Sequence, residues 1–321
     1  METIAQTYAA ETHIPARPSY GDRLFKWLTR LMALSVFALI VLIGCELAQG
    51  SRLTLWNFGW HFLVGSEWNP VTGQLGALPF IFGTLVSSAI ALAIAVPLSM
   101  GTAIYLTELA PSWLSKILTW LIELLAAVPS VILGLWGIFV MVPWLREGCF
   151  PWLRGILGFL PLFEGPIYGV SMLAGGIIIA IMILPIITSV SREILRSVPS
   201  LQREAAYALG ATRWEVTRIA VLTYAKRGLY GAIILGLGRA LGETMAVTMV
   251  IGNRAEIMTS LFAPGYTLAS VVANEFTEAT TEVYLSSLFE IGLVLFGITV
   301  LVNGVAQLLL KTFTASGDAP P

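Results

Sequence analysis

The 321-residue sequence is poor in charge, histidine and cysteine. Asp, Glu, Lys and Arg make up 12% of it, against roughly a quarter in soluble domains. It has two histidines and contains no G-x-x-x-x-G-K-[ST] phosphate loop, no H-E-x-x-H and no G-x-S-x-G. The two cysteines, Cys45 and Cys149, are expected to be buried free thiols. These absences argue against a histidine-based hydrolase or a metal site, and any ATP that the protein needs must be bound by another chain.

Apolar sequence is abundant instead. Hydrophobic residues make up 57% of the chain and the mean hydropathy is +0.83, as in integral membrane proteins. We expect the first apolar segment to be a retained helix, because it is longer than the apolar core of a signal peptide and no small-residue cleavage site follows it. Six segments approach or exceed the roughly 20 residues that a spanning helix needs: 27–48, 80–106, 117–142, 169–190, 229–252 and 288–310.

The distribution of Lys and Arg indicates how these spans are oriented. With the N-terminus in the cytoplasm, thirteen of these residues lie inside, four lie outside, and Arg239 lies within a span. We therefore predict an all-α polytopic membrane protein with six transmembrane helices, both termini cytoplasmic, and short interfacial helices in the loops. Residues 21–314 form the expected membrane domain, and residues 1–20 and 315–321 form mobile tails. The net charge of −1 gives no indication of nucleic-acid binding.

Arg239 and Glu243 lie inside the fifth apolar segment. A charged side chain at the centre of a spanning helix costs about 2.5 to 3.5 kcal/mol on insertion scales, so it is rarely kept without a partner and a task. Their i, i+4 spacing places both on one helix face. Ten residues from position 229, at about 1.5 Å each, place Arg239 near the midplane, with Glu243 about one turn further out. A direct functional role and a static salt bridge both fit this pattern.

Two glycines flank the arginine. Gly238 and Gly242 form a G-x-x-x-G pair, which lets a neighbouring helix approach closely. The wider G-x-G-x-x-x-G run is not a dinucleotide motif, because its spacing differs and no strand precedes it. We interpret the glycines as a helix-packing surface that also leaves room beside Arg239.

The connection between the fourth and fifth segments, residues 191–228, is long and polar. Good helix formers run over residues 202–209 into Gly210, which can adopt a left-handed conformation and end the helix. Thr212 and Glu215 have the spacing of a capping box at the start of a second short helix. The sequence predicts a helix, a glycine bend and a helix that project from the membrane.

Part of this connection resembles a motif of a known protein family. Glu204, Ala205, Ala206 and Gly210 have the spacing of the EAA loop, the cytoplasmic motif that ABC importer permeases present to their ATPases. The second half of the motif departs from the family pattern, since alanine and threonine stand where isoleucine and proline are usual. The resemblance implies that this segment couples the chain to an ATPase.

The fifth segment extends the resemblance. Residues 238–247 (GRALGETMAV) and 250–253 (VIGN) resemble the fifth-helix signature of the PstC-type permease of bacterial phosphate ABC importers. The likeness runs from about residue 56 to the end of the last span and is weakest over residues 143–168. Supporting stretches are 67–70, 82–86, 105–111 and 126–130.

The resemblance implies a multi-pass permease of the bacterial inner membrane, surrounded by lipid. Arg239, Glu243, Thr244 and Asn253 would line or gate the substrate path. The implied partners are a PstA-like sister permease, two copies of a PstB-like ATPase and a PstS-like periplasmic phosphate-binding protein. The chain itself is expected to have no catalytic residue, metal or cofactor, because ATP and magnesium belong to the ATPase.

The charge pair suggests a gating hypothesis. The guanidinium of Arg239 can bond two phosphate oxygens and stays charged, whereas Glu243 repels an anion. We expect the pair to be closed at rest and to part during the ATP-driven cycle. Two alternatives stay open: a permease for another oxyanion such as sulfate or molybdate, and a membrane enzyme that uses the pair on a lipid or polyprenyl phosphate.

Overall fold

The computed structural model describes residues 20–315, with side chains up to Leu308. The expected tails lie outside this range except for Tyr20 and Ala315, which begin and end helices. Residues up to Glu46 form one compact unit and residues from Leu47 form a second. The described part of the first unit belongs to helix α2 (Tyr20–Gly50), which has no buried residue.

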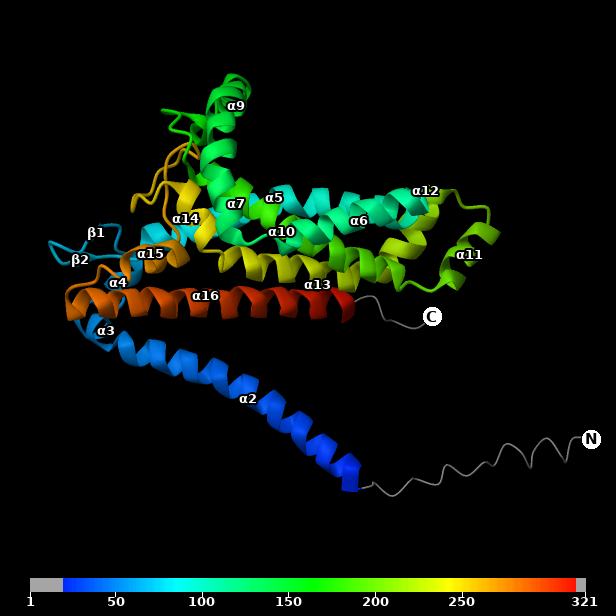
Figure 1. Ribbon diagram of the computed structural model, residues 1–321, viewed down its shortest axis with the longest axis horizontal. Helices are drawn as coiled ribbons and strands as arrows, with labels where there is room; N and C mark the ends of the chain where they lie inside the picture. Colours follow the sequence, from blue (N-terminus) through cyan, green and yellow to red (C-terminus); the bar gives the residue numbers. More distant parts are fainter. Residues whose placement is uncertain (1–19, 316–321) are drawn as a thin grey trace, which may run out of the picture. The chain divides into compact units, whose positions relative to one another are not determined.

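The second unit is built almost entirely of helices (Figure 1). Its long helices are α5 (Leu78–Ile104), α10 (Met172–Arg196), α13 (Leu222–Leu241) and α16 (Glu282–Ala315). The shorter α-helices are α3 (Arg52–Phe58), α4 (His61–Val64), α6 (Ser112–Ala127), α7 (Ser130–Trp136), α8 (Val142–Trp144), α9 (Phe150–Leu157), α11 (Ser200–Ala208), α12 (Arg213–Glu215), α14 (Met245–Ile251) and α15 (Leu268–Glu275).

Irregular helical turns and one hairpin complete the unit. A single antiparallel hairpin pairs Trp68 with Leu75. The π-helices are η1 (Tyr105–Leu109), η2 (Gly137–Met141), η3 (Leu145–Cys149) and η5 (Val216–Val221), the 3₁₀ helix is η4 (Pro161–Phe163), and the strands are β1 (Trp68–Asn69) and β2 (Gln74–Leu75).

Six helices in the described part of the chain are long and apolar enough to cross a membrane, which confirms the predicted class and number of spans. The third span differs from the prediction, because the segment 117–142 is not one helix. Helix α6 ends at Ala127, and Val128 and Pro129 are extended, since proline disfavours helical backbone in the residue before it. The third span instead covers Ser130–Leu157, so it includes residues 143–157, which the prediction placed between the third and fourth spans.

The fifth span is also shifted. It begins at Arg213 and ends at Leu241, so the short second helix predicted in the connection is the first turn of the span. The capping box of Thr212 and Glu215 is present, which confirms where that helix starts. The predicted end at residue 252 is wrong, because the backbone breaks after Leu241 and resumes as α14.

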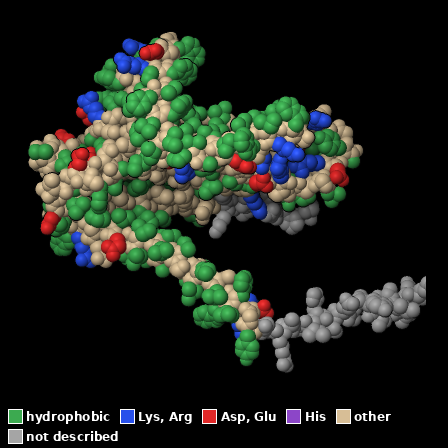
Figure 2. All heavy atoms as spheres, in the orientation of Figure 1, with side chains coloured by type: hydrophobic (Ala, Val, Ile, Leu, Met, Phe, Trp, Pro, Cys, Tyr) green, Lys and Arg blue, Asp and Glu red, His purple; other side chains and the backbone are tan. Residues whose placement is uncertain are grey.

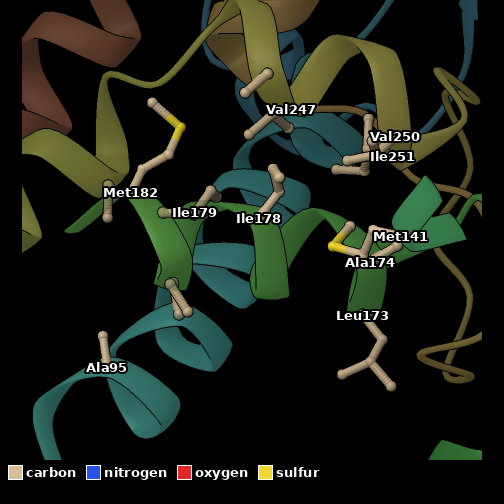
Figure 3. Packing of buried hydrophobic residues seen from close by; sticks show 14 of the residues in the cluster. Ala95, Met141, Leu173, Ala174, Ile178, Ile179, Met182, Val247, Val250 and Ile251 are labelled. Atoms are coloured by element: carbon tan, nitrogen blue, oxygen red, sulfur yellow. The ribbon is translucent and has the colours of Figure 1, made fainter. Parts of the chain in front are cut away.

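Helix α10 is the central element of the second unit. It packs against α5, α6, α13 and α14, and its buried residues include Ile178, Ile183 and Ile187. Figure 3 shows Ile178 pointing toward Val247 of α14, with Ile251 of the same short helix nearby. A helix that is apolar on all sides is expected where neighbours surround it. In Figure 1, α11 and α12 lie at one end of the long helices, and β1, β2 and α15 lie at the other.

A second core lies at the hairpin end. The carboxylate of Glu275 accepts hydrogen bonds from the Trp68 indole at 2.8 Å and the Tyr284 hydroxyl at 2.6 Å. Burial raises the pKa of Tyr266 above its usual value, so its hydroxyl stays protonated and accepts a hydrogen bond from Asn274. These bonds fix the hairpin to α15 and α16.

The two cysteines are both free. Cys149 is half-buried, but Cys45 is exposed on α2. The prediction of a buried thiol is therefore wrong for Cys45, because α2 has no buried side chain at any position.

Gly83 marks the closest backbone approach between α5 and the segment that follows α14. A Cβ on Gly83 would lie 2.0 Å from the carbonyl oxygen of Tyr266, which is a backbone atom. We therefore expect Gly83→Ala to lower stability by on the order of 1 to 3 kcal/mol, seen as a lower melting temperature and yield in detergent. Gly101→Ala on the same helix is the control, because its Cβ would meet nothing within 4 Å. Equal behaviour of the two variants would contradict the close approach.

Candidate functional site

The predicted charge pair lies at a break between two helices. Helix α13 ends at Leu241 and α14 begins at Met245. Glu243 is therefore not one turn further along the helix of Arg239, as the sequence predicted, but in the break itself. Its carboxylate Oε1 accepts a long hydrogen bond of 3.5 Å from the backbone N–H of Ala246, which gives a partner to one of the free N–H groups at the start of α14.

Arg239 and Glu243 stay neighbours across this break. The distance from Arg239 Nη2 to Glu243 Oε2 is 3.8 Å, and the two side chains are 47% and 7% exposed. Direct charge-assisted hydrogen bonds are shorter, about 2.7 to 2.9 Å, so the guanidinium is only loosely held. The arginine thus keeps an accessible head that can reach another anion, while the carboxylate points into the protein.

Arg239 lies further from the start of its helix than the sequence predicts. The continuous helix begins at Arg213 rather than at residue 229, which puts Arg239 roughly 39 Å from its first residue at about 1.5 Å per residue. Only two residues of α13 follow the arginine. Its depth in the bilayer stays a prediction.

The two flanking glycines do not bring another helix of this chain into tight contact. Among the described residues, a Cβ on Gly242 would meet only the carbonyl oxygen of Gly238, at 3.7 Å, and a Cβ on Gly238 would meet the Asn303 amide at ordinary contact distance, 3.7 Å. The tight approach is at Gly236, where a Cβ would lie 2.6 Å from Ile187. Close packing of another helix on the glycine pair stays a prediction, with a second subunit as the candidate neighbour.

Thr244 and Asn253 lie at the two ends of α14. Thr244 is half-buried beside Glu243, and its hydroxyl donates to the Gly242 carbonyl at 3.2 Å. Asn253 is exposed with a φ of +51°, a left-handed conformation that asparagine tolerates better than most residues. Its amide Nδ2 donates to the Thr248 carbonyl at 2.8 Å. The structure thus places Thr244 next to the charge pair and gives Asn253 a role in ending α14.

The predicted EAA segment folds as expected. Helix α11 carries Glu204, Ala205 and Ala206 and is followed by Gly210, whose φ is +82°. This left-handed conformation favours glycine. The helix, the bend and the capped start of the next helix are therefore confirmed as structure, while the coupling role stays a prediction.

Helix α11 offers an exposed surface. No residue in it is buried, and the large apolar side chains of Leu201 and Tyr207 are 73% and 49% exposed, with Leu209 just beyond at 90%. Figure 2 shows Lys and Arg side chains gathered at this end of the molecule. The exposed basic residues there include Arg196, Arg213, Arg218 and Lys226. A surface that combines large apolar and charged groups is typical of a protein interface.

One contact at this end was missed by sequence reasoning. Arg203 Nη2 lies 2.9 Å from Glu108 Oε1, although 95 positions separate the two residues. The available signal was an isolated acidic residue, Glu108, near the end of the second span. No group of three or more His, Cys, Asp or Glu that could hold a metal occurs within residues 20–315.

Comparison with solved structures identifies the fold. The chain is similar to a chain of a bacterial alginate ABC transporter crystallised with an alginate pentasaccharide-bound periplasmic protein, with a TM-score of 0.57 and 14% identity over 93% of this chain and 99% of that one. It is also similar to the MetNI methionine ABC transporter in an inward facing conformation, with a TM-score of 0.53 and 15% identity over 77% of this chain and 99% of that one. At these identities the likeness shows the fold alone.

Sequence comparison identifies the family. The family described as "binding-protein-dependent transport system inner membrane component" matches residues 95–314. The chain is 48% identical to the phosphate transport system permease protein PstC of Mesorhizobium japonicum, over 93% of this chain and 92% of that protein. It is 47% identical to PstC of Haemophilus influenzae, over 90% and 93%, and 39% identical to PstC 2 of Mycobacterium tuberculosis, over 96% and 97%. With its six candidate spans, this multi-pass inner-membrane chain belongs to the family of phosphate transport system permease proteins PstC.

Proposed function

We propose that this chain is the permease subunit of an ATP-driven phosphate importer and forms the anion path together with a sister permease. Its relatives are named as phosphate transport permeases, that is, as transport subunits, which favours this function over an enzyme acting on a lipid phosphate. The observation that carries the path assignment is the half-exposed guanidinium of Arg239 beside the buried carboxylate of Glu243.

The break between α13 and α14 makes a gate physically possible. Arg239 belongs to α13, whereas Glu243 lies beyond its end and contacts the first turn of α14. A rotation at the break can change the distance between the two side chains, which a continuous helix would hold fixed. The Glu243 carboxylate repels an anion that approaches Arg239, since two like unit charges about 4 Å apart repel by about 4 kcal/mol at an effective dielectric of 20. Glu243 therefore lowers the affinity of Arg239 for anions until the pair parts.

A phosphate ion needs such a group because it is strongly hydrated and cannot cross hydrocarbon. A water-filled path with a few fixed donors replaces part of the hydration shell. The planar guanidinium suits this task, since it can bond two oxygens of a tetrahedral anion. A second subunit that covers the arginine-bearing face of α13 would complete the path.

The partners follow from the family and from the surface of α11. We assign the exposed face around Glu204, Ala205 and Ala206 to a cleft in a PstB-like ATPase, two copies of which would serve the two permeases. A PstA-like subunit is the sister permease, and a PstS-like protein delivers phosphate at the opposite side of the membrane. ATP and magnesium are bound by the ATPase, and both termini of this chain are cytoplasmic.

The path assignment is tested with Arg239→Gln in the full complex reconstituted in proteoliposomes. We expect radiolabelled phosphate uptake to fall at least tenfold while ATP hydrolysis is retained, because the anion loses its charged resting point. Arg254→Gln is the matched control, since that arginine is 49% exposed and also paired with a glutamate. Normal uptake by Arg239→Gln would remove Arg239 from the path.

A static salt bridge predicts a different pattern. In that case Arg239→Gln lowers the amount of folded protein in the membrane. The double variant Arg239→Glu, Glu243→Arg, which exchanges the two charges, then partly restores both folding and uptake. The gating proposal expects the exchanged variant to be folded but still inactive in uptake, because the cation then lies at a buried position on the other side of the break.

The cargo is tested by competition. One arginine does not by itself choose among tetrahedral anions, so sulfate and molybdate are the alternative substrates. We expect unlabelled phosphate, but neither sulfate nor molybdate at a hundredfold excess, to suppress labelled phosphate uptake. Competition by sulfate at equal concentration would favour a general oxyanion permease.

The coupling surface is tested with Gly210→Asp. A side chain at φ +82° costs about 1 to 2 kcal/mol and redirects the end of α11, so we expect less ATPase to co-purify with the permease. Gly73→Asp is the control, because Gly73 has a similar φ of +74° and equally open surroundings but lies in the β1–β2 turn. Undiminished ATPase binding by Gly210→Asp would count against the assignment.

A further inference from the structure

Arg203 holds α11 to two long helices at once. Its Nη2 donates to Glu108 Oε1 at 2.9 Å and to the Leu195 carbonyl at 2.9 Å, and its Nη1 donates to the Val198 carbonyl at 2.6 Å. Glu108 belongs to η1, which continues α5, and Leu195 lies in the last turn of α10. One guanidinium therefore connects the C-terminal ends of α5 and α10 to α11.

The surroundings make this contact more than a surface salt bridge. The side chains of Arg203 and Glu108 are only 23% and 12% exposed, whereas the ion pairs that contribute little to stability are those exposed to solvent. Leu195 and Val198 are themselves buried in an apolar cluster with Ala103 of α5 and with residues of η5 and α13. The guanidinium thus binds the backbone carbonyl groups of two residues whose side chains are buried in this cluster.

The remaining face of α11 is turned outward. Arg203 and Ala206, three residues apart, are half-buried, while most other residues of the helix are exposed. The direct chain connection to the next helix passes through Gly210 at the bend. Helix α11 packs on η5 and follows α10 through the three-residue link 197–199, while Arg203 adds a polar contact to the end of α5 through Glu108.

We propose that Arg203 is a positioning residue that holds α11 rigidly against the ends of α5 and α10, so that both helices follow when the ATPase displaces α11. The inference rests on the proposed coupling function. Without the contact, α11 could pivot on the three-residue link 197–199, and less of its displacement would reach α5 and α10. The planar fork of arginine is required, because a lysine ammonium cannot reach one carboxylate and two carbonyl groups with the same geometry.

The test uses the full complex with Arg203→Lys and Glu108→Gln. We expect normal co-purification of the ATPase and near-normal ATP hydrolysis, but about tenfold less phosphate imported per ATP in Arg203→Lys. Glu108→Gln keeps an acceptor for the guanidinium, so a smaller loss of about threefold is expected. Arg154→Lys, at an exposed arginine in the last turn of α9 and away from α11, is the control and should keep the wild-type ratio.

Three results would overturn the inference. An unchanged ratio of phosphate to ATP in Arg203→Lys would show that the contact transmits nothing. Loss of ATPase co-purification together with loss of folded protein would show that Arg203 only holds α11 in shape. Failure of the wild-type complex to import phosphate would refute the proposed function itself, and with it the coupling on which this inference rests.

Discussion

Every buried backbone N–H and C=O group needs a partner from the protein, because an apolar interior offers none. The break after Leu241 satisfies this constraint with side chains and tertiary contacts. Glu243 accepts from the start of α14, and the last carbonyl groups of α14, on Val250 and Ile251, accept from Ser171 and Gly265 at 3.1 and 3.0 Å. Irregular backbone is tolerated here because α14 packs on α7 and α10.

This constraint also explains why the charged pair lies where it does. The Glu243 carboxylate accepts a hydrogen bond at the start of a short helix, and the same carboxylate is within ion-pair distance of a half-exposed arginine. The structural and functional readings of Glu243 are therefore not exclusive. The group that stabilises the break is also the group whose displacement would free Arg239 for an anion.

Much of this architecture is readable from the sequence. Mean hydropathy over windows of about 20 residues identifies six spans because the cost of burying charge dominates their placement. The bend at Gly210 and the capping box at Thr212 follow from local backbone preferences, and the structure contains both. The EAA spacing was recognised by its resemblance to a family motif.

The sequence predictions were incomplete where the structure depends on breaks within apolar segments or on contacts between distant positions. Windowed hydropathy does not detect breaks, so the apolar residues of α6 and α14 extended two predicted spans beyond their true ends. The G-x-x-x-G spacing shows that a helix can approach, but not which one, and within this chain the tighter approaches on α13 are at Gly228 and Gly236. The contact between Arg203 and Glu108 joins distant positions, and no local pattern encodes it.

The π-helices η2 and η3 have a consequence for the third span. Each wide turn acts as one residue inserted into an α-helix, which turns the following side chains by about 100° around the axis. Two of them lie between α7 and α9, so the angular register of α9 is offset by about 200° from that of α7. Residues spaced at multiples of 3.6 along this span therefore do not share one stripe, and the face that α7 turns toward the protein does not continue in register onto α9.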